Sequence, residues 1–99
     1  MFLVGCAEPE TVPPAPGVVP DSGGLQPVGS PLRIDFWRAE AGVIAAVSRL
    51  TGARPDDRRR VPGCGDVVEW PDGLRLVFVG GDFRGWAFQA RTEGVNCAV

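Results

Sequence analysis

The spacing of apolar residues along the chain predicts one helix and three strands. From residue 35 to residue 51, apolar side chains recur every three or four positions, which is typical of a helix with one buried face. Asp35 is the expected N-cap of this helix, and Gly52 is the expected left-handed residue that ends it. The apolar stripe comprises Phe36, Ala39, Val43, Ala46, Val47 and Leu50.

Three short runs rich in Val, Leu, Phe and Trp follow, at residues 66–70, 74–79 and 83–90. Turn-forming residues separate them, so we expect hairpin connections. In the middle run, alternate residues form a wholly apolar face, which the helix should cover. The predicted fold class is therefore α+β, with one amphipathic helix packed on a three-stranded antiparallel meander.

Two groups of charged residues require an interpretation. Glu40 lies inside the apolar arc of the helix, so it is either a buried acid with a raised pKa or a carboxylate that reaches water or an arginine, and we favour the second. Residues 53–65 are expected to form an exposed loop. The arginine triplet 58–60 in this loop could bind an anion, but two aspartates directly before it nearly cancel its charge.

Proline and glycine dominate residues 7–31, and this composition predicts a disordered, extended tether. Prolines prevent a helix there, and the few apolar residues cannot offset the entropy cost of ordering the backbone. The expected organisation is a remnant of a signal sequence at 1–6, a disordered linker at 7–31 and a small α+β domain at 32–99.

The residues Leu3-Val4-Gly5-Cys6 resemble the bacterial lipobox, in which the cysteine is acylated and becomes the first mature residue. Only five residues precede Cys6, which is shorter than a signal peptide, so this interpretation places Met1 inside a longer reading frame. We expect Cys6 to be the lipidation site. The alternative is that the match is accidental.

Three cysteines leave one unpaired after a disulfide forms, and lipidation would account for Cys6. Cys64 and Cys97 are then expected to form a disulfide. The alternative is three free thiols in a cytoplasmic protein. A metal site is not expected, because these two cysteines lack the paired spacing of zinc ligands and the chain has no histidine.

Composition excludes several classes of function. The 99 residues include neither histidine nor lysine nor tyrosine, so the commonest general base and the Schiff-base amine are absent. The net charge of −2 gives no reason to expect a nucleic-acid partner. No cofactor motif and no catalytic constellation is found, so we predict neither cofactor nor catalytic residues.

Aromatic residues on the three predicted strands suggest a binding surface. They cannot all lie on the face that the helix covers, and Trp70, Trp86 and Phe88 are the candidate residues of a partner surface. The alternative is that a segment such as the tail from Arg91 covers them.

The chain has, in this order, a helix, a cysteine, a strand ending in Trp70, and the stretches 73–78 and 83–86. This order is similar to that of small secreted or lipid-anchored domains of GC-rich bacteria. It more distantly resembles helix-plus-sheet lipoproteins of the SmpA/OmlA outer-membrane assembly family and the β-lactamase-inhibitor fold. The resemblance implies an architecture and a binding role, without site residues. It differs in having one helix where those folds have two.

These observations predict a lipid-anchored or secreted extracytoplasmic binding module of the bacterial envelope. Its partner would be a protein or another envelope component, with the membrane reached through the lipid on Cys6. The alternatives are a small secreted enzyme that uses Glu40 or Glu69 as a buried acid, and a truncated product without a partner.

Overall fold

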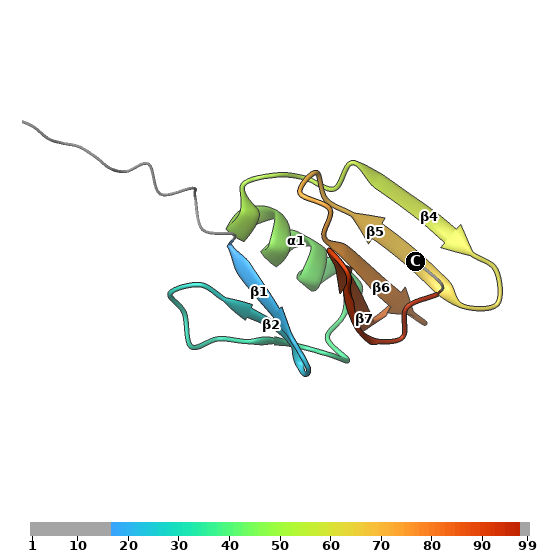
Figure 1. Cartoon of the computed structure of the whole chain (residues 1–99), viewed down its shortest axis with the longest axis horizontal. Coiled ribbons are helices and arrows are strands. Elements are labelled where there is room, and N and C mark those ends of the chain that lie inside the picture. The colour runs from blue at the N-terminus through green and yellow to red at the C-terminus, as the bar shows by residue number, and fades with distance from the viewer. Residues whose placement is uncertain (1–16, 98–99) are drawn as a thin grey trace, which may run out of the picture.

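A computed structural model of the chain describes residues 17–97, which form one helix and two antiparallel sheets (Figure 1). The smaller sheet has the strand order β1-β2-β3, and the larger has the order β4-β5-β6-β7-β8. The elements are β1 (Val18–Asp21), β2 (Gly24–Pro27), β3 (Ile34–Asp35), α1 (Glu40–Thr51), β4 (Asp57–Val61), β5 (Gly65–Glu69), β6 (Arg75–Val79), β7 (Asp82–Phe88) and β8 (Arg91–Gly94).

The helix is present, but it begins five residues later than Asp35, at Glu40. Asp35 belongs to β3, so its prediction as the N-cap is wrong. The residues just before α1 pair with the start of β7 instead, because Phe83 donates its N–H to the Arg38 carbonyl at 2.8 Å. The predicted end of the helix is confirmed, since Gly52 adopts a left-handed φ of 75°.

The three predicted strands correspond to β5, β6 and β7, and the meander that they form is confirmed. The sheet is nevertheless larger than expected. Residues 53–65 were expected to be a loop, but β4 lies within them, and β8 follows β7 on the other side. Both additional strands are edge strands with exposed, mostly charged or polar side chains. Such side chains protect a sheet edge from further pairing. They also lack the alternation of apolar and polar residues by which a strand is predicted.

The prediction of a disordered linker over 7–31 is wrong for residues 17–31, because β1 and β2 form a hairpin there. Two of its apolar side chains are deeply buried: Val18 is 3% exposed and Leu25 is fully buried. Pro20 is tolerated because β1 is an edge strand. Residues 7–16 of the predicted linker lie outside the described residues. The folded unit therefore begins before residue 32.

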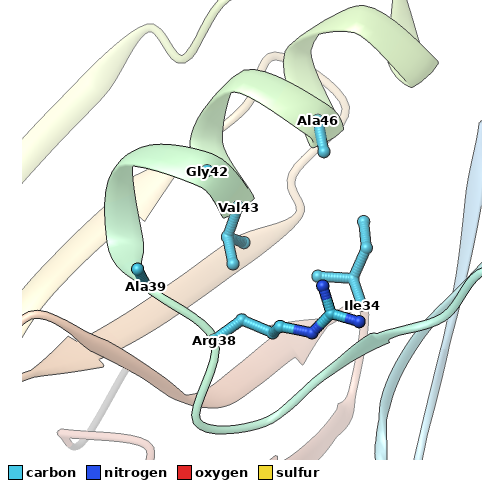
Figure 2. Close-up of a pocket in the computed structure, with 6 residues that line it drawn as sticks. All are labelled: Ile34, Arg38, Ala39, Gly42, Val43 and Ala46. Carbon is cyan, nitrogen blue, oxygen red and sulfur yellow. The ribbon is translucent and has the colours of Figure 1, made fainter.

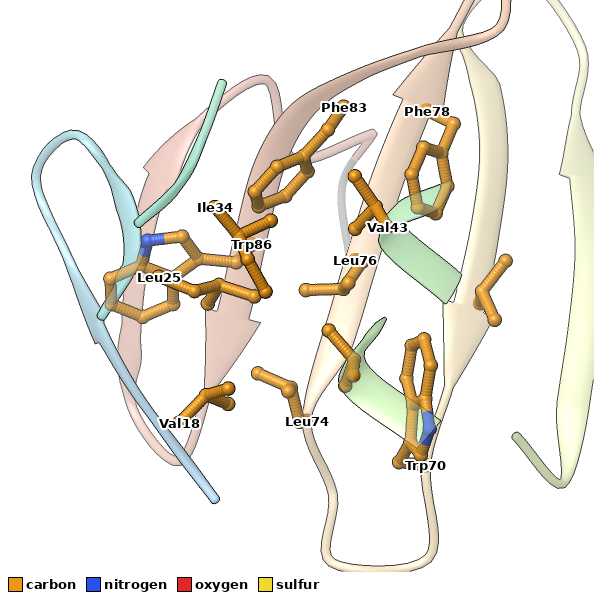
Figure 3. Packing of buried hydrophobic residues seen from close by; sticks show 12 residues of the cluster. Val18, Leu25, Ile34, Val43, Trp70, Leu74, Leu76, Phe78, Phe83 and Trp86 are labelled. Carbon is orange, nitrogen blue, oxygen red and sulfur yellow. The ribbon is translucent and has the colours of Figure 1, made fainter. Parts of the chain in front are cut away.

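A single apolar cluster joins the helix to both sheets (Figure 3). Val43 and Val47 from α1 pack with Leu74, Leu76 and Phe78, which are the alternating residues that the helix was expected to cover. The small sheet packs against the other side of the same cluster (Figure 1). The N-terminal hairpin is therefore part of the core and not an appendage.

On the opposite face of the larger sheet, the segment that follows β8 packs against β7. Val67, Val77 and Gly85 are cross-strand neighbours on this face, and both valines are fully buried. The Val95 carbonyl lies so close to Gly85 that a Cβ on residue 85 would be 1.8 Å from its oxygen. The segment then continues across the sheet to Cys97, so this glycine makes room for the crossing (Figure 1).

Candidate functional site

The partner surface predicted from the strand aromatics is not exposed. Trp86 is fully buried and Trp70 is 1% exposed, while Phe88 is half-buried and packs against the core. Trp70 donates its indole N–H to the Ala53 carbonyl at 3.1 Å. Trp70 and Trp86 therefore form no open surface, which corrects the prediction for these two residues, and the N-terminal hairpin is what covers Trp86. Trp86 lies beneath this hairpin and donates its indole N–H to the carbonyl of Asp21.

The predicted disulfide between Cys64 and Cys97 is confirmed, with Cα atoms 5.6 Å apart. It joins the turn before β5 to the segment that follows β8. Cys6, the predicted lipidation site, lies outside the described residues.

Glu40 is part of a compact network of charged side chains. It forms an ion pair with Arg58, which also reaches Asp66 at 3.3 Å. Arg60 contacts the other oxygen of Asp66 at 2.6 Å. Two carboxylates and two guanidinium groups therefore balance one another, and the expectation that Glu40 reaches an arginine is confirmed. Glu69 similarly lies 3.8 Å from the guanidinium of Arg75. These contacts are those of structural ion pairs.

A groove lies between α1 and the segment that connects β2 to β3. Two adjoining cavities, of about 290 and 220 Å³, share Ile34, Arg38 and Ala46 in their walls. Figure 2 shows the Arg38 side chain extending beneath the helix toward Ile34. The second cavity continues along the helix and is also lined by Pro27, Ser30, Leu32, Arg33, Arg49 and Leu50. The groove therefore has an apolar floor and arginines in its walls.

The arginines of the groove differ in how their charge is balanced. Arg33 binds Asp21 at 2.7 Å and Asp35 at 2.8 Å. The hydrogen bond from Arg33 lowers the pKa of Asp21 from 3.8 to about 2. Arg38 and Arg49, in contrast, form no ion pair with an acidic side chain of residues 17–97. These two arginines leave the groove with positive charge.

Trp37 is an exposed aromatic residue in a strained backbone conformation. Its φ is 80°, a left-handed value that bulky residues rarely adopt, and its side chain is 64% exposed. The guanidinium of Arg84 lies 3.8 Å from the ring centroid, which is a cation–π contact. The backbone N–H of Trp37 donates a hydrogen bond to the Phe83 carbonyl, and this bond helps to hold the left-handed conformation.

Sequence analysis did not single out the groove. Arg38 precedes α1 and Arg49 lies in its last turn, and neither position by itself indicates more than a solvated surface. The signal that could have found the site is the combination of these arginines with Leu32, an apolar residue in a proline- and glycine-rich stretch. The β2–β3 connection brings it to the helix, and the sequence pattern does not reveal this pairing.

Within residues 17–97, no group of three or more histidine, cysteine or acidic residues could hold a metal ion. No helix in the same part of the chain is long and apolar enough to cross a membrane.

Comparison with known proteins finds no matching family model, no matching curated protein and no matching solved structure. The candidate site is therefore argued from its own chemistry alone.

Proposed function

We propose that the chain is an extracytoplasmic binding module of the bacterial envelope, held at the membrane by a lipid on Cys6. The observation that carries the binding role is the groove between α1 and the β2–β3 connection. It offers an apolar floor beside Arg38 and Arg49, whose charges no acidic side chain of the described chain balances. Such a surface fits an anionic partner that also carries apolar groups.

Two features support an extracytoplasmic location. The disulfide between Cys64 and Cys97 is typical of proteins that fold in an oxidising compartment. The lipobox-like residues that end in Cys6 give the third cysteine a role that needs no partner thiol. Multiple acyl chains on one cysteine would anchor the domain firmly.

The anchor is tested by the intact mass of the protein, expressed in a bacterium that processes lipoproteins, with its native upstream sequence. We expect a mass that starts at Cys6 with added acyl chains. Two thiols should become alkylated only after reduction. A mass that starts at Met1 with three alkylatable thiols would overturn both the anchor and the location. A Cys6→Ser variant is the matched control, because it retains the disulfide and lacks the acylated thiol.

A further inference from the structure

The connection between β2 and β3 presents two exposed aliphatic side chains. Leu32 is 75% exposed and Val28 is 48% exposed, although both lie in a segment of only a few residues. Leu32 also lines the groove next to α1. Isolated exposed apolar residues are ordinary on protein surfaces, but Leu32 lines a groove that also carries arginines, and Val28 lies in the same short connection. The position of Val28 and Leu32 beside the groove, and not their exposure alone, makes them candidates for a binding surface.

The charge beside these aliphatic side chains is positive. The part of the groove that includes Leu32 is lined by Arg33, Arg38 and Arg49 and by no acidic residue. Arg33 is paired with both Asp21 and Asp35, so these three side chains together carry one negative charge, and Arg38 and Arg49 make the whole group positive by one charge. We call Val28, Leu32, Arg38 and Arg49 the docking face.

Gly17, the first residue that the structure describes, lies beside the docking face. Gly17 accepts a hydrogen bond of 3.0 Å from the N–H of Val28. It also packs so closely on α1 that a Cβ at this position would be 1.9 Å from the Leu50 carbonyl oxygen. Leu50 is itself a groove residue. A chain that is anchored through Cys6 would therefore bring this side of the domain toward the bilayer.

We propose that the docking face binds the anionic headgroup surface of the membrane. Arg38 and Arg49 would contact lipid phosphates, while Val28 and Leu32 would enter the interfacial layer. This inference rests on the proposed anchor, because two arginines and two aliphatic residues bind a bilayer only weakly by themselves. The distance from Cys6 to Gly17 is at most about 40 Å for a fully extended chain. This limit keeps the domain near the surface and raises its effective concentration there.

The test uses the full chain carrying Cys6→Ser, so that no acyl group contributes to binding. Sedimentation is measured with vesicles of equal parts phosphatidylglycerol and phosphatidylcholine, and with vesicles of phosphatidylcholine alone. We expect binding to the anionic vesicles only, and a loss of binding as salt is added. Arg38→Gln with Arg49→Gln should weaken the partition coefficient about 25-fold, which is about fivefold for each arginine. Leu32→Ser should weaken it further.

The matched control is the double variant Arg59→Gln with Arg91→Gln. It removes the same charge from two exposed arginines on the edge strands of the larger sheet, neither of which lines the groove. We expect this control to bind nearly as well as the parent. Unfolding midpoints of all variants are compared, so that loss of folding is distinguished from loss of binding.

Four outcomes would overturn the proposal, and a fifth would contradict the anchor alone. Equal binding to neutral and anionic vesicles would show that charge does not drive the binding. Equal losses of binding in the control and in the Arg38/Arg49 variant would show that only the net charge of the protein matters. Anionic binding that appears only after Glu8→Gln and Glu10→Gln would assign the groove to the chain's own acidic N-terminal segment. If the wild-type protein is acylated but its Cys6→Ser form does not bind anionic vesicles, the docking proposal is contradicted and the anchor stands. An unacylated protein that binds them would contradict the anchor alone.

Discussion

The indole N–H of Trp86 donates a hydrogen bond of 2.7 Å to the backbone carbonyl of Asp21, 65 residues earlier in the chain. This bond connects the centre of the larger sheet to the turn end of the N-terminal hairpin. Because Trp86 is fully buried, the hairpin both covers its ring and satisfies its only polar atom.

Trp86→Phe should lower the free energy of unfolding by about 1–3 kcal/mol, because it leaves the Asp21 carbonyl without its partner and creates a small cavity. Urea unfolding followed by circular dichroism measures this change. Trp37→Phe is the matched control, since that indole is mostly exposed and should cost far less. Equal effects at the two positions would mean that the hairpin does not pack on Trp86 in solution.

The sequence predicts the centre of this fold better than its edges. Strands β5, β6 and β7 and the end of α1 follow from alternation, turn residues and a stop glycine. The hairpin was missed because it lies in the proline- and glycine-rich stretch 7–31, although Ser22-Gly23 between two short apolar stretches is a turn signal. Strand β4 was missed because four of its five residues are charged. Whether such an edge strand or hairpin forms depends on what packs against it, and the local sequence does not show this long-range packing.

The candidate site was missed for the same reason. Trp86 was a candidate for a partner surface because nothing in the local pattern shows that β1 and β2 cover it. Once the hairpin is folded, its connection to β3 places Leu32 beside Arg38 and Arg49. The docking face is therefore a product of long-range packing.

Removing the disulfide should destabilise the domain substantially. Cys64 and Cys97 are separated by 33 residues, and closing a loop of this length is worth about 3–4 kcal/mol in the chain-entropy model. Cys64→Ser with Cys97→Ser should therefore unfold at clearly lower urea concentration than the parent. Reductant should shift the unfolding of a Cys6→Ser protein in the same direction. Identical midpoints with and without reductant would contradict a stabilising role for the disulfide.

The ion pair between Asp21 and Arg33 should make stability depend on pH in acid. Arg33 lowers the pKa of Asp21 from 3.8 to about 2 in the folded protein. The folded state therefore holds fewer protons than the unfolded state between these values, so the pair stabilises fully above about pH 4 and is lost as pH falls toward 2. The side chains are partly exposed, so salt should weaken the effect. Asp21→Asn should flatten thermal unfolding midpoints over this pH range, and an unchanged slope would contradict the assignment.

Trp37 offers a direct test of backbone strain. At a φ of 80°, a residue with a Cβ is strained, whereas glycine adopts this conformation freely. Trp37→Ala and Trp37→Gly both remove the ring and its contact with Arg84, so they differ only in the backbone at this position. We expect the glycine variant to be about 1 kcal/mol more stable than the alanine variant, despite the larger entropy that glycine loses on folding. Urea unfolding of the two variants measures the difference. Alanine as the more stable variant would show that residue 37 does not hold a left-handed conformation, and the loop that leads into α1 would then differ from the one described.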